Sequence, residues 1–211
     1  MRKPFDTNQD RLKSSILYGS VLGDASINQY GSVQFRQSLQ KIEYIQWLYK
    51  NLVDFTTGNG LSYFSQYDYR TKKVYLSCGF ATRRVFLKYR TLFYPTGRKL
   101  LPESFAEDFN RVALAVWYMD DGARTSKTEK AVYFTLDSFT VQEIECIQQV
   151  FREKFGIDTT FQKAGKTSKG TPQHRIRVGV KSYPAFYDHI YPIVSQVEYM
   201  KRSKLPDPKD F

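Results

Sequence analysis

Two aspartates, Asp24 and Asp121, stand 97 residues apart, and each closes an apolar segment that has the spacing of a helix. A carboxylate is unfavourable at a helix C-terminus by about 0.3–1 kcal/mol, because the helix macrodipole is negative there. If the two helices packed side by side, the carboxylates would also repel each other unless they were protonated or held a cation. A hard divalent metal with oxygen ligands, most naturally Mg²⁺, resolves this conflict. On a basic protein, such a site is typical of phosphodiester hydrolysis.

An internal repeat favours this interpretation over the plainer one, in which Asp120-Asp121-Gly122 is only an acidic turn that ends a helix. The sequence LYGSVLGDA at 17–25 is echoed by LAVWYMDDG at 114–122. Further echoes follow in the same order at offsets of 97–100 residues, and they are Val33/Val132, Phe35/Phe134, Phe55/Phe155, Gly79/Gly179 and Tyr94/Tyr191. Each half then closes with a basic cluster and Leu-Pro. This shared order indicates duplication into two similar subdomains related by a pseudo-twofold axis.

Each half is expected to fold in the order α-β-α-β-β-α, which gives an α+β protein with one half at 1–105 and the other at 106–211. In the first half, the pattern predicts helices at 11–22, 42–55 and 83–94 and strands at 32–37, 61–69 and 73–80. In the second half, it predicts helices at 111–120, 144–155 and 183–191 and strands at 131–135, 159–163 and 174–180. Ser15, Gly19 and Gly23 form a stripe of small residues that would let the first motif helix approach its counterpart closely. The second motif helix is less regular, because it carries Trp117.

Composition narrows the class of partner. The chain has 211 residues, 41% of them hydrophobic, and a formal net charge of +11, so it can bury a core and favours a polyanion. Its longest apolar run, 112–119, is far shorter than a membrane span of about 20 residues, and no secretory signal is visible. Two cysteines and two histidines make neither a disulfide framework nor an ordinary zinc site. We therefore expect an intracellular, reducing compartment.

Polar side chains alternate with apolar ones along the expected strands, so each sheet is predicted to have a polar face that can read bases in the major groove. In the first half the DNA-binding candidates are Ser32, Gln34, Arg36, Lys73 and Tyr75, with Arg70 and Lys72 in a basic turn. In the second half they are Tyr133, Thr135, Gln173, Arg175 and Arg177, with Lys163, Lys166 and Lys169 at a basic turn. The turn cations are expected to contact phosphate. Because the halves differ at matching positions, we expect an asymmetric target.

The two motifs resemble those that name the LAGLIDADG family of homing endonucleases, in its single-chain, two-motif type. The flanking pattern is similar to the branch that contains the yeast omega-intron endonuclease. The shared pieces are Leu22-Gly-Asp24-Ala25, the whole of 114–122, Ser138-Phe-Thr140, Lys99 before Pro102, and Lys204-Leu-Pro206. One copy of the motif is short and degenerate, but two copies at domain spacing with matching lysines are specific. The resemblance covers nearly the whole chain.

The resemblance implies antiparallel sheets that form a DNA-binding saddle, with the motif helices packed at its centre. It implies an intron-encoded, site-specific endonuclease that works as a monomer. Such an enzyme makes Mg²⁺-dependent double-strand breaks with 3′ overhangs in a long DNA target. The compartment implied is a mitochondrion or chloroplast if the gene is organellar, and a prokaryotic cytoplasm otherwise.

The resemblance also implies roles for six residues. Asp24 and Asp121 match the catalytic acids, which share two or more metal ions between them. Gly23 and Asp120 precede these acids, and their backbone would add metal contacts. Lys99 and Lys204 match the basic residues that lie near the scissile phosphates, where a cation can stabilise developing charge.

Three alternatives stay open. An RNA-binding intron maturase on the same scaffold would bind intron RNA, although the two intact acids favour cleavage. A non-catalytic DNA-binding regulator would bind its site even without Asp24 and Asp121. A protein of the membrane surface is least favoured, because no segment has a sustained basic amphipathic pattern.

Overall fold

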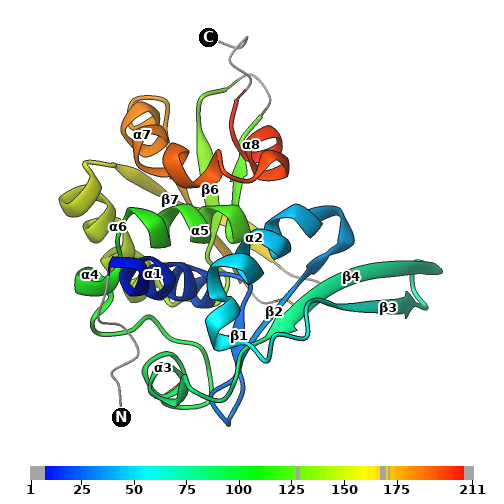
Figure 1. Cartoon of the computed structure of the whole chain (residues 1–211). Coiled ribbons are helices and arrows are strands. Elements are labelled where there is room, and N and C mark those ends of the chain that lie inside the picture. Colours follow the sequence, from blue (N-terminus) through cyan, green and yellow to red (C-terminus); the bar gives the residue numbers. More distant parts are fainter. Residues whose placement is uncertain (1–7, 127–128, 167–169, 171, 207–211) are drawn as a thin grey trace.

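The computed structural model describes residues 8–126, 129–166, 170 and 172–206. The first half of the chain forms α1 (Asn8–Leu22), β1 (Ser26–Ile27), β2 (Val33–Ser38), η1 (Leu39–Lys41), α2 (Ile42–Leu52), η2 (Val53–Phe55), β3 (Ser62–Asp68), β4 (Lys73–Ala81) and α3 (Leu87–Phe93). The second half forms α4 (Phe105–Asp108), α5 (Arg111–Asp121), β5 (Gly122–Arg124), β6 (Val132–Thr135), α6 (Val141–Phe155), β7 (Thr159–Lys166), β8 (Pro172–Val178), α7 (Tyr183–Val194) and α8 (Glu198–Lys204). Figure 1 shows α1 and α5 packed together in the middle of the molecule.

Each half contributes one four-stranded antiparallel sheet, in the order β1-β2-β4-β3 and β5-β6-β8-β7. The register also matches, because Phe35 lies opposite Phe80 on the buried face just as Phe134 lies opposite Ile176. This confirms the predicted α+β fold with two pseudo-symmetric halves. The sequence did not reveal β1 and β5, since strands of two and three residues are too short to show alternation. The boundary at 105/106 falls where α4 begins and stays a prediction.

The two motif helices meet along the small-residue stripe that the sequence predicted. A Cβ added to Gly19 would lie 2.5 Å from the backbone oxygen of Ala113, so only a hydrogen side chain permits this approach. At one end of the stripe, the Asn110 Nδ2 atom donates a hydrogen bond of 2.7 Å to Ser15 Oγ. The same Asn110 side chain caps α5 by accepting from the backbone N–H of Val112. The stripe therefore fixes how the two halves are joined.

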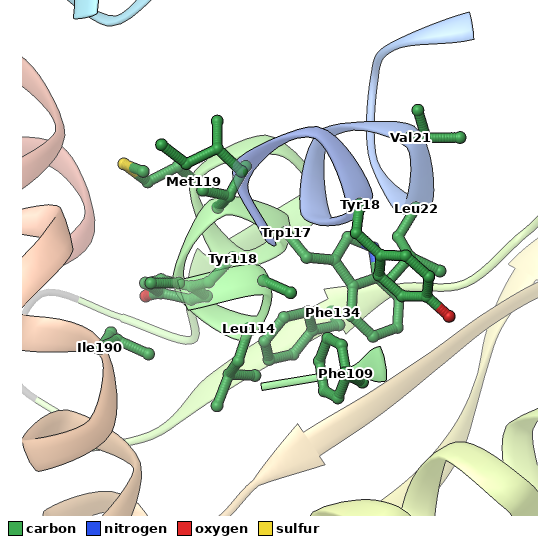
Figure 2. Close-up of a cluster of buried hydrophobic side chains, with 14 of the residues drawn as sticks. Tyr18, Val21, Leu22, Phe109, Leu114, Trp117, Tyr118, Met119, Phe134 and Ile190 are labelled. Carbon is green, nitrogen blue, oxygen red and sulfur yellow. The ribbon is translucent and has the colours of Figure 1, made fainter. Parts of the chain in front are cut away.

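Trp117, which interrupts the small residues of the second motif, is fully buried. Its ring centroid lies 5.2 Å from that of Phe134 and 5.8 Å from that of Phe109, within the aromatic cluster of the second half. Figure 2 shows this cluster, to which Tyr118 also belongs. Burying aromatic rings of this size supplies much of the hydrophobic stabilisation of the second half.

Several predicted boundaries were wrong, and backbone hydrogen bonds explain the clearest case. The helix expected at 83–94 begins only at Leu87, because the Arg83 carbonyl oxygen accepts hydrogen bonds from the Val85 backbone N–H and from Thr82 Oγ1. In the second half, β7 continues to Lys166, past the predicted end at 163, and β8 begins at Pro172. The short α4 and α8 were not expected. Within the described ranges, no helix is long and apolar enough to cross a membrane.

Candidate active site

The ends of the two motif helices bring Asp24 and Asp121 into one cluster. Asp24 is exposed just beyond α1, and Asp121 is the half-buried last residue of α5. Burial, and then the charge of Asp24, raises the pKa of Asp121 to about 6. The Trp117 indole N–H opposes this shift by donating a hydrogen bond of 3.1 Å to Asp121 Oδ2. The carboxylate conflict that the sequence predicted is therefore present in the folded chain.

A third carboxyl group, that of Asp120, is buried in the same cluster. It fills the space beside Gly23, where an added Cβ would lie 2.6 Å from Asp120 Oδ2. Its Oδ2 accepts a long hydrogen bond of 3.4 Å from the backbone N–H of Asp24. Burial, followed by the two neighbouring carboxylates, holds the pKa of Asp120 well above its ordinary value. The sequence assigned only a backbone role to this residue, and its side chain proves to be a contact between the halves.

Gln37 joins these carboxyl groups and was missed by the sequence analysis. Its Nε2 atom donates to Asp24 Oδ2 at 2.6 Å and to Asp120 Oδ1 at 3.2 Å. The signal was visible in β2, where Gln37 shares the buried face with Val33 and Phe35. A polar residue on a buried strand face needs partners, because an unsatisfied amide is costly there. The matching position in the second half is the buried Leu136, which makes no such bond.

Lys99 and Lys204 lie on either side of this cluster, each against the backbone of one motif. The Lys99 ammonium donates to the Gly23 carbonyl oxygen at 2.7 Å, and the Lys204 ammonium donates to the Gly122 carbonyl oxygen. Burial lowers the pKa of both lysines, and the pKa of Lys204 falls to about 8 because Lys41 repels it as well. The sequence did not single out Lys41. Two poorly hydrated cations beside carboxylates form a site suited to a phosphate group.

The donor chemistry of the site fits Mg²⁺. Asp24 and Asp121 offer only carboxylate oxygen atoms, which are the ligands that a hard cation prefers. Among the described residues, no group of three or more His, Cys, Asp or Glu side chains is placed to hold a metal by itself. Mg²⁺ commonly uses one or two carboxylates and completes its shell with water and substrate phosphate. The site therefore fits a cation that is shared with a phosphodiester.

Most of the first-half candidates lie on one exposed face of the first sheet. Gln34, Arg36 and Tyr75 are exposed there. A hollow of about 350 Å³ on this side is lined by Asp24 together with Arg36, Gln66, Tyr75 and Ser77. Arg36 is held in place, since its Nε donates to Ser77 Oγ at 2.9 Å and its guanidinium lies 4.5 Å from the ring centroid of Phe64. The sequence missed Phe64 and Gln66, which share this face.

The second sheet presents a comparable polar face. Tyr133 opposite Arg177, and Thr135 opposite Arg175, lie on the side away from the buried Phe134 and Ile176. Gln173 continues the row, and its amide donates to Asp137 at 3.1 Å. Arg175 is held by Gln162 Oε1 at 2.9 Å and by the Tyr133 ring at 5.0 Å, whereas Arg177 is paired with Glu129. These are partly exposed side chains with fixed directions.

The structure corrects some candidates. Ser32 is buried, and its hydroxyl donates a hydrogen bond of 2.6 Å to the Thr82 carbonyl oxygen. The predicted exposure of Ser32 was therefore wrong. Lys163 and Lys166 lie in β7, on the face opposite to that of Gln162 and Arg175. Lys163 pairs with His174 by regular alternation, and a bulge after Lys163 brings Lys166 opposite Pro172 on the same face. In the first half, Arg70, Lys72 and Lys73 are exposed at the β3–β4 turn. The candidate Lys169 lies outside the described residues.

Comparisons with known proteins give consistent results. A sequence profile described as the LAGLIDADG DNA endonuclease family matches residues 14–186. The cytochrome b mRNA maturase bI2 of Debaryomyces hansenii is 25% identical over 204 residues, which cover 92% of this chain and 75% of that protein. The protein of the same name from Saccharomyces cerevisiae is 25% identical over 209 residues, covering 88% of this chain and 46% of that protein. The chain thus spans less than half of the second relative.

A solved structure described as the homing endonuclease I-WcaI bound to its DNA recognition sequence superposes with a TM-score of 0.82. The match covers 96% of this chain and 89% of that one, at 18% sequence identity. At this identity, the likeness establishes a shared fold.

Proposed function

The chain belongs to the LAGLIDADG DNA endonuclease family, and we propose that it is a site-specific endonuclease that uses Mg²⁺ to break both strands of duplex DNA. The target is long and asymmetric, and the cuts leave 3′ overhangs. The chain acts as a monomer, in which residues 1–105 and 106–211 are two halves that share one active site. An intron is the proposed location of its gene.

One observation carries this proposal: Asp24 and Asp121 meet at the joined ends of two helices, each beside a lysine. The Lys99 and Lys204 ammonium groups donate to the backbone of different motifs, so each half has one acid and one cation. A site with this pseudo-symmetry can serve one phosphodiester in each strand. A single buried acid pair of structural function would not need the two dehydrated lysines.

Each group has a role that follows from its chemistry. When bound, Mg²⁺ supplies an activated water and neutralises charge on the phosphate. Asp24 and Asp121 would hold the cation from opposite halves. Lys99 and Lys204 stabilise negative charge that develops on the phosphate oxygens, and their partial burial strengthens this effect. Gln37 keeps the Asp24 carboxylate in one orientation through its hydrogen bond of 2.6 Å.

The polar faces of the two sheets support an asymmetric target. Arg36 and Gln34 of the first sheet correspond to Thr135 and Tyr133 of the second, so the halves offer different groups to the base edges. Lys73, which lies on the same face of β4 as Tyr75, would contact phosphate. The structural neighbour that is bound to its DNA recognition sequence supports the same mode of binding.

The test is cleavage of a randomised DNA library by the wild type, Asp24→Asn and Asp121→Asn, with Mg²⁺ or with a chelator. Asp188→Asn, an exposed position on α7, is the matched control. We expect metal-dependent double-strand cuts in the wild type and the control, and no double-strand cuts in either motif variant. If all four proteins bound the DNA and none of them cut it, the proposed endonuclease activity would be refuted.

A second candidate is an RNA-binding intron maturase on the same scaffold. The observation that favours it is the name of both curated relatives, cytochrome b mRNA maturase bI2. The two functions are compatible if DNA and RNA use different surfaces. Splicing of an intron transcript by Asp24→Asn would support this candidate whether or not the wild type cuts DNA.

A further inference from the structure

The β3–β4 hairpin projects from the body of the molecule, and the side that faces the helices stays uncovered (Figure 1). Tyr63 and Tyr67 of β3 and Val74 and Leu76 of β4 point to this side, because the register places Tyr63 opposite the buried Cys78. Their exposed fractions are 64%, 47%, 59% and 51%. We call these four residues, with Ser65 between the tyrosines, the back face of the hairpin. It is opposite to the front face, which carries Arg36, Phe64 and Tyr75.

The fold itself does not require an apolar back face. At the matching positions of the second sheet, Lys163 replaces Tyr63 and Pro172 replaces Leu76, with His174 in the place of Cys78. A solvated, basic surface is therefore compatible with the same strands. Large apolar side chains that gather on an exposed surface commonly mark a place where a partner binds.

The residue types specify the partner. Tyr63 and Tyr67 stand four residues apart on one strand, about 13 Å along it, and Tyr69 packs edge-on against Tyr67 with ring centroids 4.9 Å apart. Arg70 and Lys72 are exposed at the adjoining turn. Exposed rings flanked by cations are the chemistry by which proteins hold single-stranded nucleic acid, with bases stacked on the rings and cations against the backbone. A duplex offers no unstacked bases to such a surface.

We propose that the back face of the β3–β4 hairpin binds single-stranded RNA by stacking on Tyr63 and Tyr67, while the front face holds duplex DNA. The Ser65 hydroxyl lies between the two rings and can exchange a hydrogen bond with a ribose 2′-hydroxyl, which DNA lacks. This inference rests on the second candidate function and assigns a surface to it. Because the faces are opposite, RNA and duplex DNA can occupy one chain together.

The test compares three full-length proteins: the wild type, the double variant Tyr63→Ser/Tyr67→Ser, and a front-face control, Phe64→Ser/Tyr75→Ser. The probes are labelled oligouridylate, oligothymidylate of equal length, and a random-sequence duplex DNA. Losing two stacked bases should weaken oligouridylate binding by about 30-fold or more in the back-face variant. The front-face variant should bind oligouridylate as tightly as the wild type does and should bind the duplex more weakly. In the wild type, duplex DNA should not displace the oligouridylate.

Equal oligouridylate binding by all three proteins would overturn the proposal, and so would displacement by the duplex. If oligothymidylate bound as tightly as oligouridylate, the proposed ligand of the back face would have to change from RNA to single-stranded DNA. A wild-type dimer that becomes monomeric in the back-face variant would show that a second copy covers this face. If the double variant does not fold, photocrosslinking of 5-iodouridine RNA to the wild type decides: crosslinks at Tyr63 or Tyr67 support the proposal, and crosslinks only on the front face refute it. DNA cleavage is measured separately, so failure of the endonuclease is not confused with failure of this surface.

Discussion

Gly19→Ala should separate the two acids while leaving the chain folded. The added Cβ would lie 2.5 Å from Ala113 O and 2.9 Å from Val116 Cβ, against ordinary contacts that begin at 3.4 Å. Backbone in a packed helix cannot give locally, so α1 and α5 must move apart by about 1 Å. Asp24 lies five residues beyond Gly19 and moves with α1, whereas Asp121 moves with α5.

The expected magnitudes differ for stability and activity. Overpacking costs about 1–3 kcal/mol, and the better helix propensity of alanine returns about 1 kcal/mol, so the loss of unfolding free energy should be at most about 2 kcal/mol. A misplacement of about 1 Å in an active site can lower the rate about 100-fold. Activity should therefore fall much further than stability.

The assay pairs single-turnover cleavage with denaturant unfolding, and uses Gly179→Ala as the matched control. A Cβ at Gly179 meets only Arg177 Nη1 at 3.4 Å, an ordinary contact. The control should match the wild type in both measurements. If a folded Gly19→Ala protein cuts DNA at the wild-type rate, the helix contact does not set the spacing of the acids.

Four further predictions concern the site itself. Because the pKa of Asp121 is raised to about 6, a proton competes with the cation, and cleavage at subsaturating Mg²⁺ should fall about tenfold per pH unit below pH 6. The stability of the metal-free chain should change in the opposite sense. The folded state holds the extra proton, so the free energy of unfolding falls as the pH rises from 3.8 to about 6. Denaturation at a series of pH values measures this slope, and an Asp121→Asn variant with the same slope as the wild type would contradict the prediction. Lys204→Met should bind duplex DNA as the wild type does but yield mostly nicked product on a supercoiled plasmid, because Lys99 is intact in the other half; loss of both cuts together would argue against one lysine per strand. Gln37→Leu leaves the buried Asp120 without its amide donor, so thermal unfolding should show a loss of about 1–3 kcal/mol, whereas Gln37→Asn with wild-type stability and activity would argue that the bond to Asp24 does not matter.

The sequence by itself determined the duplication, the helix and strand types and the position of an Asp at the end of each motif helix. These follow from local patterns: apolar periodicity for the long elements, the stripe at Ser15, Gly19 and Gly23 for the close helix contact, and an Asp at each motif end. The features that the sequence did not reveal were equally local. The strands β1 and β5 have too few residues for a period, and the bulge after Lys163, which places Lys166 on the same face as Lys163, leaves no trace in alternation.

The tertiary structure alone decided which groups the two acids meet. Asp120 and Asp121 are neighbours in the chain, yet one is buried against Gly23 of the other half and the other faces Lys99 and Lys204. Successive residues of a helix point about 100° apart, so the packing partner, and not the residue type, selects the side chain that enters the site. The same holds for Gln37, whose two acceptors are 13 and 83 residues away in the sequence. The bond from Gln37 to Asp120 exists only after the two halves have packed, because no local pattern encodes the distance between them.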